Sequence, residues 1–128
     1  MVAVRLKKEK EMKVTEQTDQ KILKIITDSL DDMKAEDVIT IDLAGKTSIA
    51  SYMVVASGNS NRHVASIAQK IEENLKAGGF RCTMEGEIKA DWVLIDAFDV
   101  IVHIFRPEVR EFYNLEKMWQ SAANLREK

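Results

Sequence analysis

The sequence predicts an α+β domain, of the α/β type, in which helices flank a mixed sheet of about five strands. Two stretches, residues 92–97 and 100–105, are apolar at successive positions and rich in Val, Ile and aromatic residues, which is typical of strands covered on both faces. Two others, residues 22–33 and 64–75, repeat apolar residues at helical spacing. With the weaker patterns described below, the expected order is α-β-β-α-β-β-β-α.

The composition is that of an ordinary globular domain, with 128 residues, 45% hydrophobic and 31% charged. This length is sufficient for one core without disulfides or metals. The single cysteine, Cys82, cannot form an internal disulfide, and no apolar run approaches the roughly 18 residues of a membrane span. Because the N-terminus also has no apolar core of signal-peptide length, we expect a cytoplasmic protein with no membrane segment.

The charge differs between the start of the chain and the rest. Residues 1–13 contain five Lys or Arg and two Glu, a balance of +3, so residues 14–128 sum to −5 within the total of −2. We expect residues 1–14 to form a basic, poorly ordered tail and residues 15–128 to form the single domain. The acidic domain suits a basic protein partner better than a phosphate backbone. The tail could touch nucleic acid, although a solvated arm is the simpler interpretation.

The first half of the chain predicts a helix, two strands and a second helix. The first helix is expected from about Thr18, capped by Thr18 or Thr15, with an apolar stripe that ends at Met33. Residues 38–43 alternate as a strand that buries Ile39, Ile41 and Leu43, and residues 52–56 form the second strand. The loop 57–61 leads to a helix capped by Ser60 or Asn61, with Val64, Ile67, Ala68, Ile71 and Leu75 inward. Gly78 and Gly79 are expected to end it in the left-handed conformation.

The second half predicts three strands and a closing helix. A short strand is expected over residues 80–84, and a turn near Phe98 and Asp99 separates the strands 92–97 and 100–105. Pro107, the only proline, suits the first turn of a helix. The apolar stripe of that helix is predicted to be Phe112, Leu115, Met118 and Trp119.

The search for catalytic, cofactor or metal residues gives no constellation. The loop 57–61 could bind an anion at the start of a helix, but it lacks the spaced glycines and the GKS or GKT ending of phosphate-binding motifs. Asp96 and Asp99, three residues apart, do not share a strand face as metal-binding carboxylates would. His103 is expected to be a satisfied structural histidine and His63 to be exposed. We therefore predict a protein that is not an enzyme and has no cofactor.

A surface around Trp92 remains as the candidate functional feature. Glu85, Glu87 and Asp91 precede this tryptophan at the start of a strand, and a Trp with acidic neighbours is typical of an anchor for a basic partner protein. The equally plausible alternative is that Trp92 simply packs under the last helix.

Two long segments resemble the ribosomal silencing factor family, also called Iojap-like proteins. They are SYMVVASGNSNRHVASIAQKIEENL and DWVLIDAFDVIVHIFRPEVREFYNLEKMW, and the resemblance covers roughly residues 19–120. It implies a fold like the nucleotidyltransferase palm without the catalytic carboxylates. It also implies binding to the large ribosomal subunit through its ribosomal protein fourteen, which blocks joining with the small subunit and lowers translation when nutrients are limited. In such proteins the Trp of the DW pair, here Trp92, lies on the docking surface.

Two positions depart from the family pattern, and other functions stay open. Ser51 stands where the family often has Asp, and Phe98 stands where it usually has Gly. The alternatives are a large-subunit assembly factor and a nucleotidyltransferase-like enzyme with an unrecognised site. A weak homodimer could cover apolar surface at Phe98, Val100 or Val102, and contact of residues 1–14 with ribosomal RNA is an open possibility.

Overall fold

The predicted order of three helices and five strands is confirmed in the computed structural model of the chain. The structure describes residues 2–43, 48 and 50–117, with residues 2–16 described by their backbone alone. The elements are α1 (Val2–Asp32), β1 (Glu36–Asp42), β2 (Tyr52–Ser57), α2 (Asn61–Ala77), β3 (Thr83–Glu85), β4 (Trp92–Ala97), β5 (Val100–Phe105) and α3 (Pro107–Tyr113).

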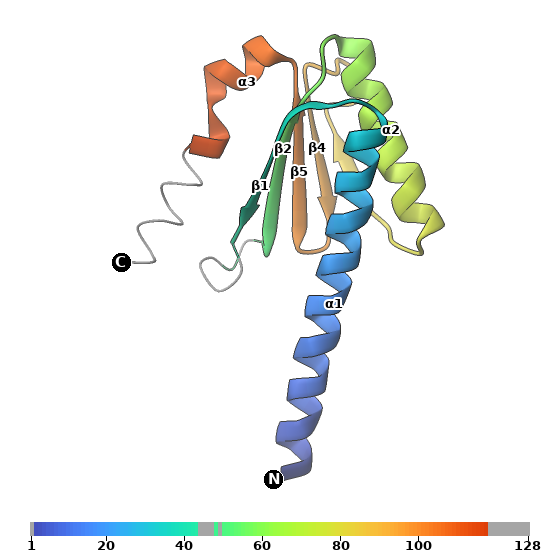
Figure 1. Cartoon of the computed structure of the whole chain (residues 1–128), viewed down its shortest axis with the longest axis vertical. Helices are drawn as coiled ribbons and strands as arrows, with labels where there is room; N and C mark the ends of the chain where they lie inside the picture. The colour runs from blue at the N-terminus through green and yellow to red at the C-terminus, as the bar shows by residue number, and fades with distance from the viewer. Residues whose placement is uncertain (1, 44–47, 49, 118–128) are drawn as a thin grey trace.

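The five strands form one mixed sheet in the order β1-β2-β5-β4-β3. β5 lies at its centre, parallel to β2 and antiparallel to β4, and the other neighbouring pairs are antiparallel. Helices α1 and α2 cover one face, while α3 lies on the opposite face (Figure 1). The expected α+β domain with a helix-flanked mixed sheet is therefore confirmed.

Strand alternation divides the core into two parts. Under α1 and α2, fully buried residues of the helices meet Val54, Val93, Ile95, Val102 and Ile104 of the sheet. On the other face, a smaller cluster of Met53, Val55 and Phe105 packs against residues of α3 and the segment after it. The larger cluster holds the fold together, and the smaller one positions the region around Trp92.

The first helix is longer than the sequence analysis expected. It begins at Val2, and its first half extends past the sheet and α2 (Figure 1). Neither Thr15 nor Thr18 caps it, since both lie within the helix. The reason for the difference is intrinsic propensity: residues 5–13 are all Arg, Leu, Lys, Glu or Met, and no Gly or Pro interrupts the chain before the predicted helix. The start of the first helix is therefore earlier than expected, while the poor order expected of residues 1–14 stays a prediction.

Three local expectations also need correction. Of the two glycines expected to end α2 in the left-handed conformation, Gly79 adopts positive φ at +88°, whereas Gly78 caps the helix at φ −83°. The third strand is shorter and later than residues 80–84. The predicted burial of β4 on both faces holds for one face only, because Leu94 is half-buried and Asp96 is exposed on the other.

The last helix differs most from its prediction. α3 ends at Tyr113, and Asn114 follows in the left-handed conformation at φ 49°. Phe112 is therefore not part of a buried stripe, and its side chain is 81% exposed. Leu115 packs on the smaller core cluster as expected, whereas Met118 and Trp119 lie outside the described residues.

Among the described residues, no helix has the length and apolar character needed to cross a membrane.

Candidate partner-binding surface

Trp92 begins β4 and lies on the face of the sheet that carries α3. Its ring stacks on Phe105 of β5, with centroids 4.9 Å apart, and it meets Tyr113 of α3 at the same centroid distance. The side chain is nevertheless only half-buried. Trp92 thus packs against the last helix, as one interpretation of the sequence required, and it keeps an exposed part, as the other required.

A partly buried hydrogen bond fixes the orientation of the Trp92 ring. The indole Nε1–H donates to Nδ1 of His103 over 3.0 Å, and His103 is 7% exposed. Burial lowers the pKa of His103 to about 4, so the imidazole is neutral near pH 7 and Nδ1 is free to accept. His103 is therefore the satisfied structural histidine that was expected, and it holds an aromatic side chain of the surface in place.

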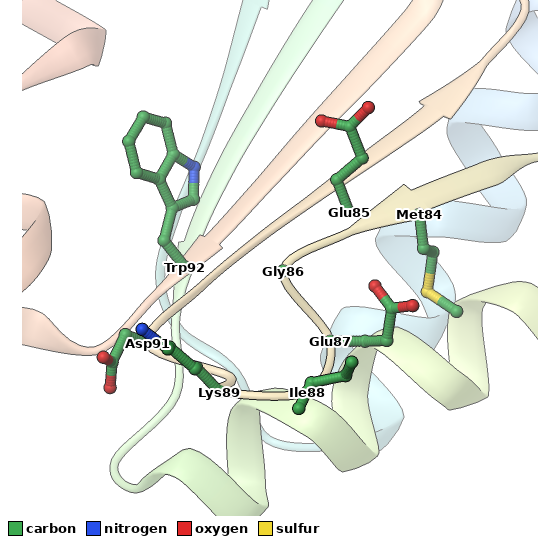
Figure 2. A pocket seen from close by; sticks show the side chains of 8 residues that line it. All are labelled: Met84, Glu85, Gly86, Glu87, Ile88, Lys89, Asp91 and Trp92. Atoms are coloured by element: carbon green, nitrogen blue, oxygen red, sulfur yellow. The ribbon is translucent and has the colours of Figure 1, made fainter.

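Glu85 lies beside Trp92 on the same face of the sheet. The register places it opposite Leu94, two residues along from Trp92 and therefore on the same side of the pleat. Figure 2 shows the Trp92 ring and the Glu85 carboxylate rising from that side, next to the loop that carries Glu87 and Ile88. Both glutamates are exposed. Two of the three acids predicted from the sequence are thus at the surface.

The loop between β3 and β4 borders an open depression of about 450 Å³. Gly86 allows this loop to pass close to the backbone of β4, since it has φ +87° and a β-carbon on it would overlap the Trp92 carbonyl oxygen. The depression is lined by Met84, Glu85, Gly86, Glu87, Ile88, Lys89, Asp91 and Trp92. Ile88 is 95% exposed, so an apolar side chain stands in solvent among the acids.

Asp91 has a different position from the two glutamates. Its Oδ1 accepts a 2.8 Å hydrogen bond from Nδ2 of Asn61 and lies 3.5 Å from Nη1 of Arg106. The same Asn61 amide also donates to the Lys89 carbonyl. The Asp91 backbone carbonyl accepts from the Arg106 N–H as well. These contacts tie the loop to the start of α2 and the end of β5, so Asp91 shapes the surface more than it offers a free charge.

Two aromatic residues extend this surface; the sequence analysis placed Phe112 in an apolar stripe and did not consider Tyr113. Phe112 is 81% and Tyr113 51% exposed, and their rings meet edge-on with centroids 5.1 Å apart. Tyr113 connects them to Trp92. The signal that could have found them is Asn114, because Asn readily adopts the left-handed conformation that ends a helix.

A buried arginine secures α3 beside this surface. Arg110 is 8% exposed; its Nη1 donates to Oγ of Ser57 over 2.8 Å and its Nε to Oε1 of Glu116 over 3.0 Å. Oε2 of Glu116 is buried and has no hydrogen-bond partner within the described structure. Arg110 therefore links the helix to the end of β2 and neutralises a carboxylate that is mostly buried.

The remaining polar residues considered in the sequence analysis make contacts within the fold. Ser60 caps α2 by accepting from the His63 N–H. His63 was expected to be exposed but is half-buried: its Nδ1 accepts from the Asn59 N–H and its Nε2 lies 2.8 Å from the Met33 carbonyl. Burial and Glu72 raise the pKa of the Cys82 thiol. Among the described residues, no group of three possible metal-ligating side chains occurs.

The residues considered for a homodimer are only partly at the surface. Val100 and Val102 are fully buried beneath α1 and α2, which excludes them as an apolar surface for a second copy. Phe98 is 61% exposed in the turn between β4 and β5, at φ 58°, and meets Phe80 edge-on. A phenylalanine thus occupies a conformation that favours glycine.

Comparisons with known proteins agree on one family. The family model described as "Ribosomal silencing factor during starvation" matches residues 15–128. A ribosomal silencing factor of Zymomonas mobilis is 59% identical over 99 residues, covering 77% of this chain and 74% of that protein. A crystal structure of a Chromobacterium violaceum protein has a TM-score of 0.77 and 39% identity, covering 79% of this chain and 85% of that one. A mouse protein named for mitochondrial assembly of the ribosomal large subunit is 32% identical over 89 residues, covering 66% and 39%.

Proposed function

Because the chain belongs to the ribosomal silencing factor family, we propose that it binds the large ribosomal subunit through ribosomal protein fourteen and thereby prevents joining with the small subunit. The mechanism is steric, since a surface occupied by this protein cannot also receive the small subunit. Translation is lowered in proportion to the large subunits that are occupied. No chemical step is required of any residue.

The observation that carries this proposal is the half-exposed, fixed position of Trp92. Aromatic anchors contribute most to binding when they are rigid before the partner arrives, because little conformational entropy is then lost. The hydrogen bond to His103 and the stacking on Phe105 supply that rigidity. We assign Trp92 the role of apolar anchor, with Tyr113 extending the contact.

The charge around the anchor supports a basic partner. Glu85 and Glu87 are exposed beside Trp92, and residues 14–128 carry a net charge of −5. Lysine and arginine side chains on the partner would find complementary charge there, which favours specificity and rapid association. Asp91, proposed from sequence as a contact, is assigned the additional role of holding the loop in shape through Asn61 and Arg106.

Co-sedimentation with purified large subunits, small subunits and joined ribosomes tests this function. The parent protein is expected to bind large subunits alone and to reduce joining when small subunits are added. Trp92→Ala is expected to weaken binding by about 2 kcal/mol, roughly 30-fold. Phe98→Ala is the matched control, since it removes an exposed aromatic residue far along the strand from Trp92 and should bind like the parent.

Because Trp92→Ala also removes packing in the core, a surface variant is needed beside it. Glu85→Lys combined with Glu87→Lys reverses two exposed charges without altering the core and is expected to lower the association rate, with less effect at high salt. Unchanged binding of both variants, with folding verified by circular dichroism, would show that this surface is not the contact.

A second candidate function is assembly of the large subunit, which the name of the mouse relative favours. An assembly factor should prefer precursor particles, whereas a silencing factor should bind mature subunits at least as well. Comparing the two affinities in one assay separates these functions. Metal-dependent nucleotide binding in calorimetry would instead support the nucleotidyltransferase-like alternative.

A further inference from the structure

The first half of α1 stands apart from the folded body. α1 has 31 residues, and its first buried side chain within the described positions is Asp19, followed by Ile22, Ile26 and Leu30. At about 1.5 Å per residue, the part before residue 17 is on the order of 22 Å long. In Figure 1 this part runs beyond the end of the sheet, with no other described element beside it. We call residues 2–14 the basic arm.

The basic arm differs from the body in charge, and it lies outside the segment that the family model matches. It holds all five Lys or Arg of residues 1–13 against two Glu, while the remainder of the chain is at −5. The family model begins at residue 15, so the arm lies outside the matched segment. No Gly or Pro interrupts residues 2–32, and the backbone of the arm continues the helix beyond the folded body (Figure 1).

We propose that the basic arm is a second binding element, which contacts the phosphate backbone of RNA on the ribosomal particle that the body binds through a protein. This proposal rests on the proposed function, since it names a further partner of the same complex. Lysine and arginine bind phosphate largely irrespective of sequence, and each contact releases condensed counterions. The acidic body cannot make such contacts well, whereas the arm has five Lys or Arg in its sequence and its backbone extends beyond the body (Figure 1).

The spacing of apolar residues favours RNA over a membrane surface. A helix that lies on a membrane needs a wide apolar face, formed by residues three and four apart. In the basic arm the apolar residues Val2, Ala3, Val4 and Leu6 lie in the first turns, and none follows until Met12 and Val14, so no apolar stripe continues along the arm. Charge without an apolar face is the pattern of a polyanion contact.

Two variants with the same change in net charge test the proposal. The arm variant replaces Arg5, Lys7, Lys8, Lys10 and Lys13 by Gln. The body variant replaces five exposed basic residues, Lys34, Arg62, Lys76, Arg81 and Lys117, by Gln. Each is measured against the full-length parent for binding to a short double-stranded RNA, to large subunits and to anionic vesicles, at several salt concentrations.

The expected result is a loss specific to the arm variant. For RNA binding, the slope of the logarithm of the association constant against the logarithm of the salt concentration should become less steep by about 3 to 4 in the arm variant, because most of the five cations each contact one phosphate. In the body variant this slope should stay near the parent value. Helical content measured by circular dichroism verifies that both variants are folded. Equal slopes for the two variants, no RNA binding by the parent, or binding to vesicles without binding to RNA would each overturn the proposal. Trp92→Ala distinguishes this failure from that of the proposed function, because it should weaken large-subunit binding while leaving the salt slope for free RNA unchanged.

Discussion

The hydrogen bond between Trp92 and His103 predicts a defined loss of stability in acid. Protonation of His103 turns Nδ1 from an acceptor into a donor that faces the indole N–H, and it places a charge in a buried site. The pKa of His103 is about 4 in the folded protein against an ordinary value of 6.5. The unfolded chain therefore binds more protons between pH 6.5 and 4, and the free energy of unfolding falls as the pH falls through this range.

The size of this effect follows from the two pKa values. Each pH unit between them changes the free energy of unfolding by up to about 1.4 kcal/mol. From pH 7 to pH 5, His103 alone should lower stability by about 2 kcal/mol, and by roughly 3 kcal/mol in total at pH 4 and below. Above about pH 7.5, roughly one unit over the ordinary pKa, His103 no longer changes the stability with pH.

Chemical denaturation at pH 7, 6 and 5, followed by far-ultraviolet circular dichroism, measures the loss. The control is His103→Asn, whose side-chain oxygen can still accept from the indole but does not titrate. Carboxylates titrate in both proteins, so the difference between the two pH dependences isolates His103. If stability falls equally in the parent and in His103→Asn, the buried neutral imidazole is not the cause and the reasoning is refuted.

Three further substitutions follow from the backbone and from the buried arginine. Gly86→Ala should destabilise by about 2–3 kcal/mol in thermal or chemical denaturation, since a β-carbon there would overlap a backbone carbonyl of β4; Gly79→Ala, at a similar φ but in open space, should cost only about 1 kcal/mol. Arg110→Met should cost about 3 kcal/mol by leaving Glu116 buried without its partner, and a smaller loss in Arg110→Met combined with Glu116→Gln would verify that cause by a double-mutant cycle. Phe98→Gly should raise the denaturation midpoint, corresponding to up to about 1 kcal/mol, because glycine adopts φ 58° without strain; a lower midpoint would mean that the contact with the neighbouring aromatic ring outweighs the strain.

The strands around the candidate surface could be predicted from sequence because local signals bound them. Asp91 and Asp99 flank β4, and Asp99 and Pro107 flank β5, so both strands begin and end where the apolar runs do. The order of strands in the sheet could not be obtained in this way. It depends on which strands pair over long distances, and no residue pattern within one strand specifies its neighbours.

The misplaced elements lacked such local signals. Nothing in the sequence marks the start of α1, since the residues before Thr18 favour a helix whether or not they pack. His63 was expected at the surface because a position early in a helix is usually exposed, and its contact with the Met33 carbonyl joins segments that are 30 residues apart. The start of α1 thus follows from helix propensity without a capping signal, whereas the position of His63 is decided by a tertiary contact.

The candidate surface owes its exposure to the point at which α3 ends. A helix that continued through Leu115 and beyond with Phe112 facing the core, as its spacing suggested, would have drawn that ring inward. Asn114 instead takes the left-handed conformation at φ 49°, and Phe112 and Tyr113 stay exposed beside Trp92. The neighbouring face of β4 is left half open as well, with Leu94 only partly buried. A short helix ended by one asparagine thus leaves aromatic residues accessible next to acidic side chains, a combination that is typical of surfaces that bind basic proteins.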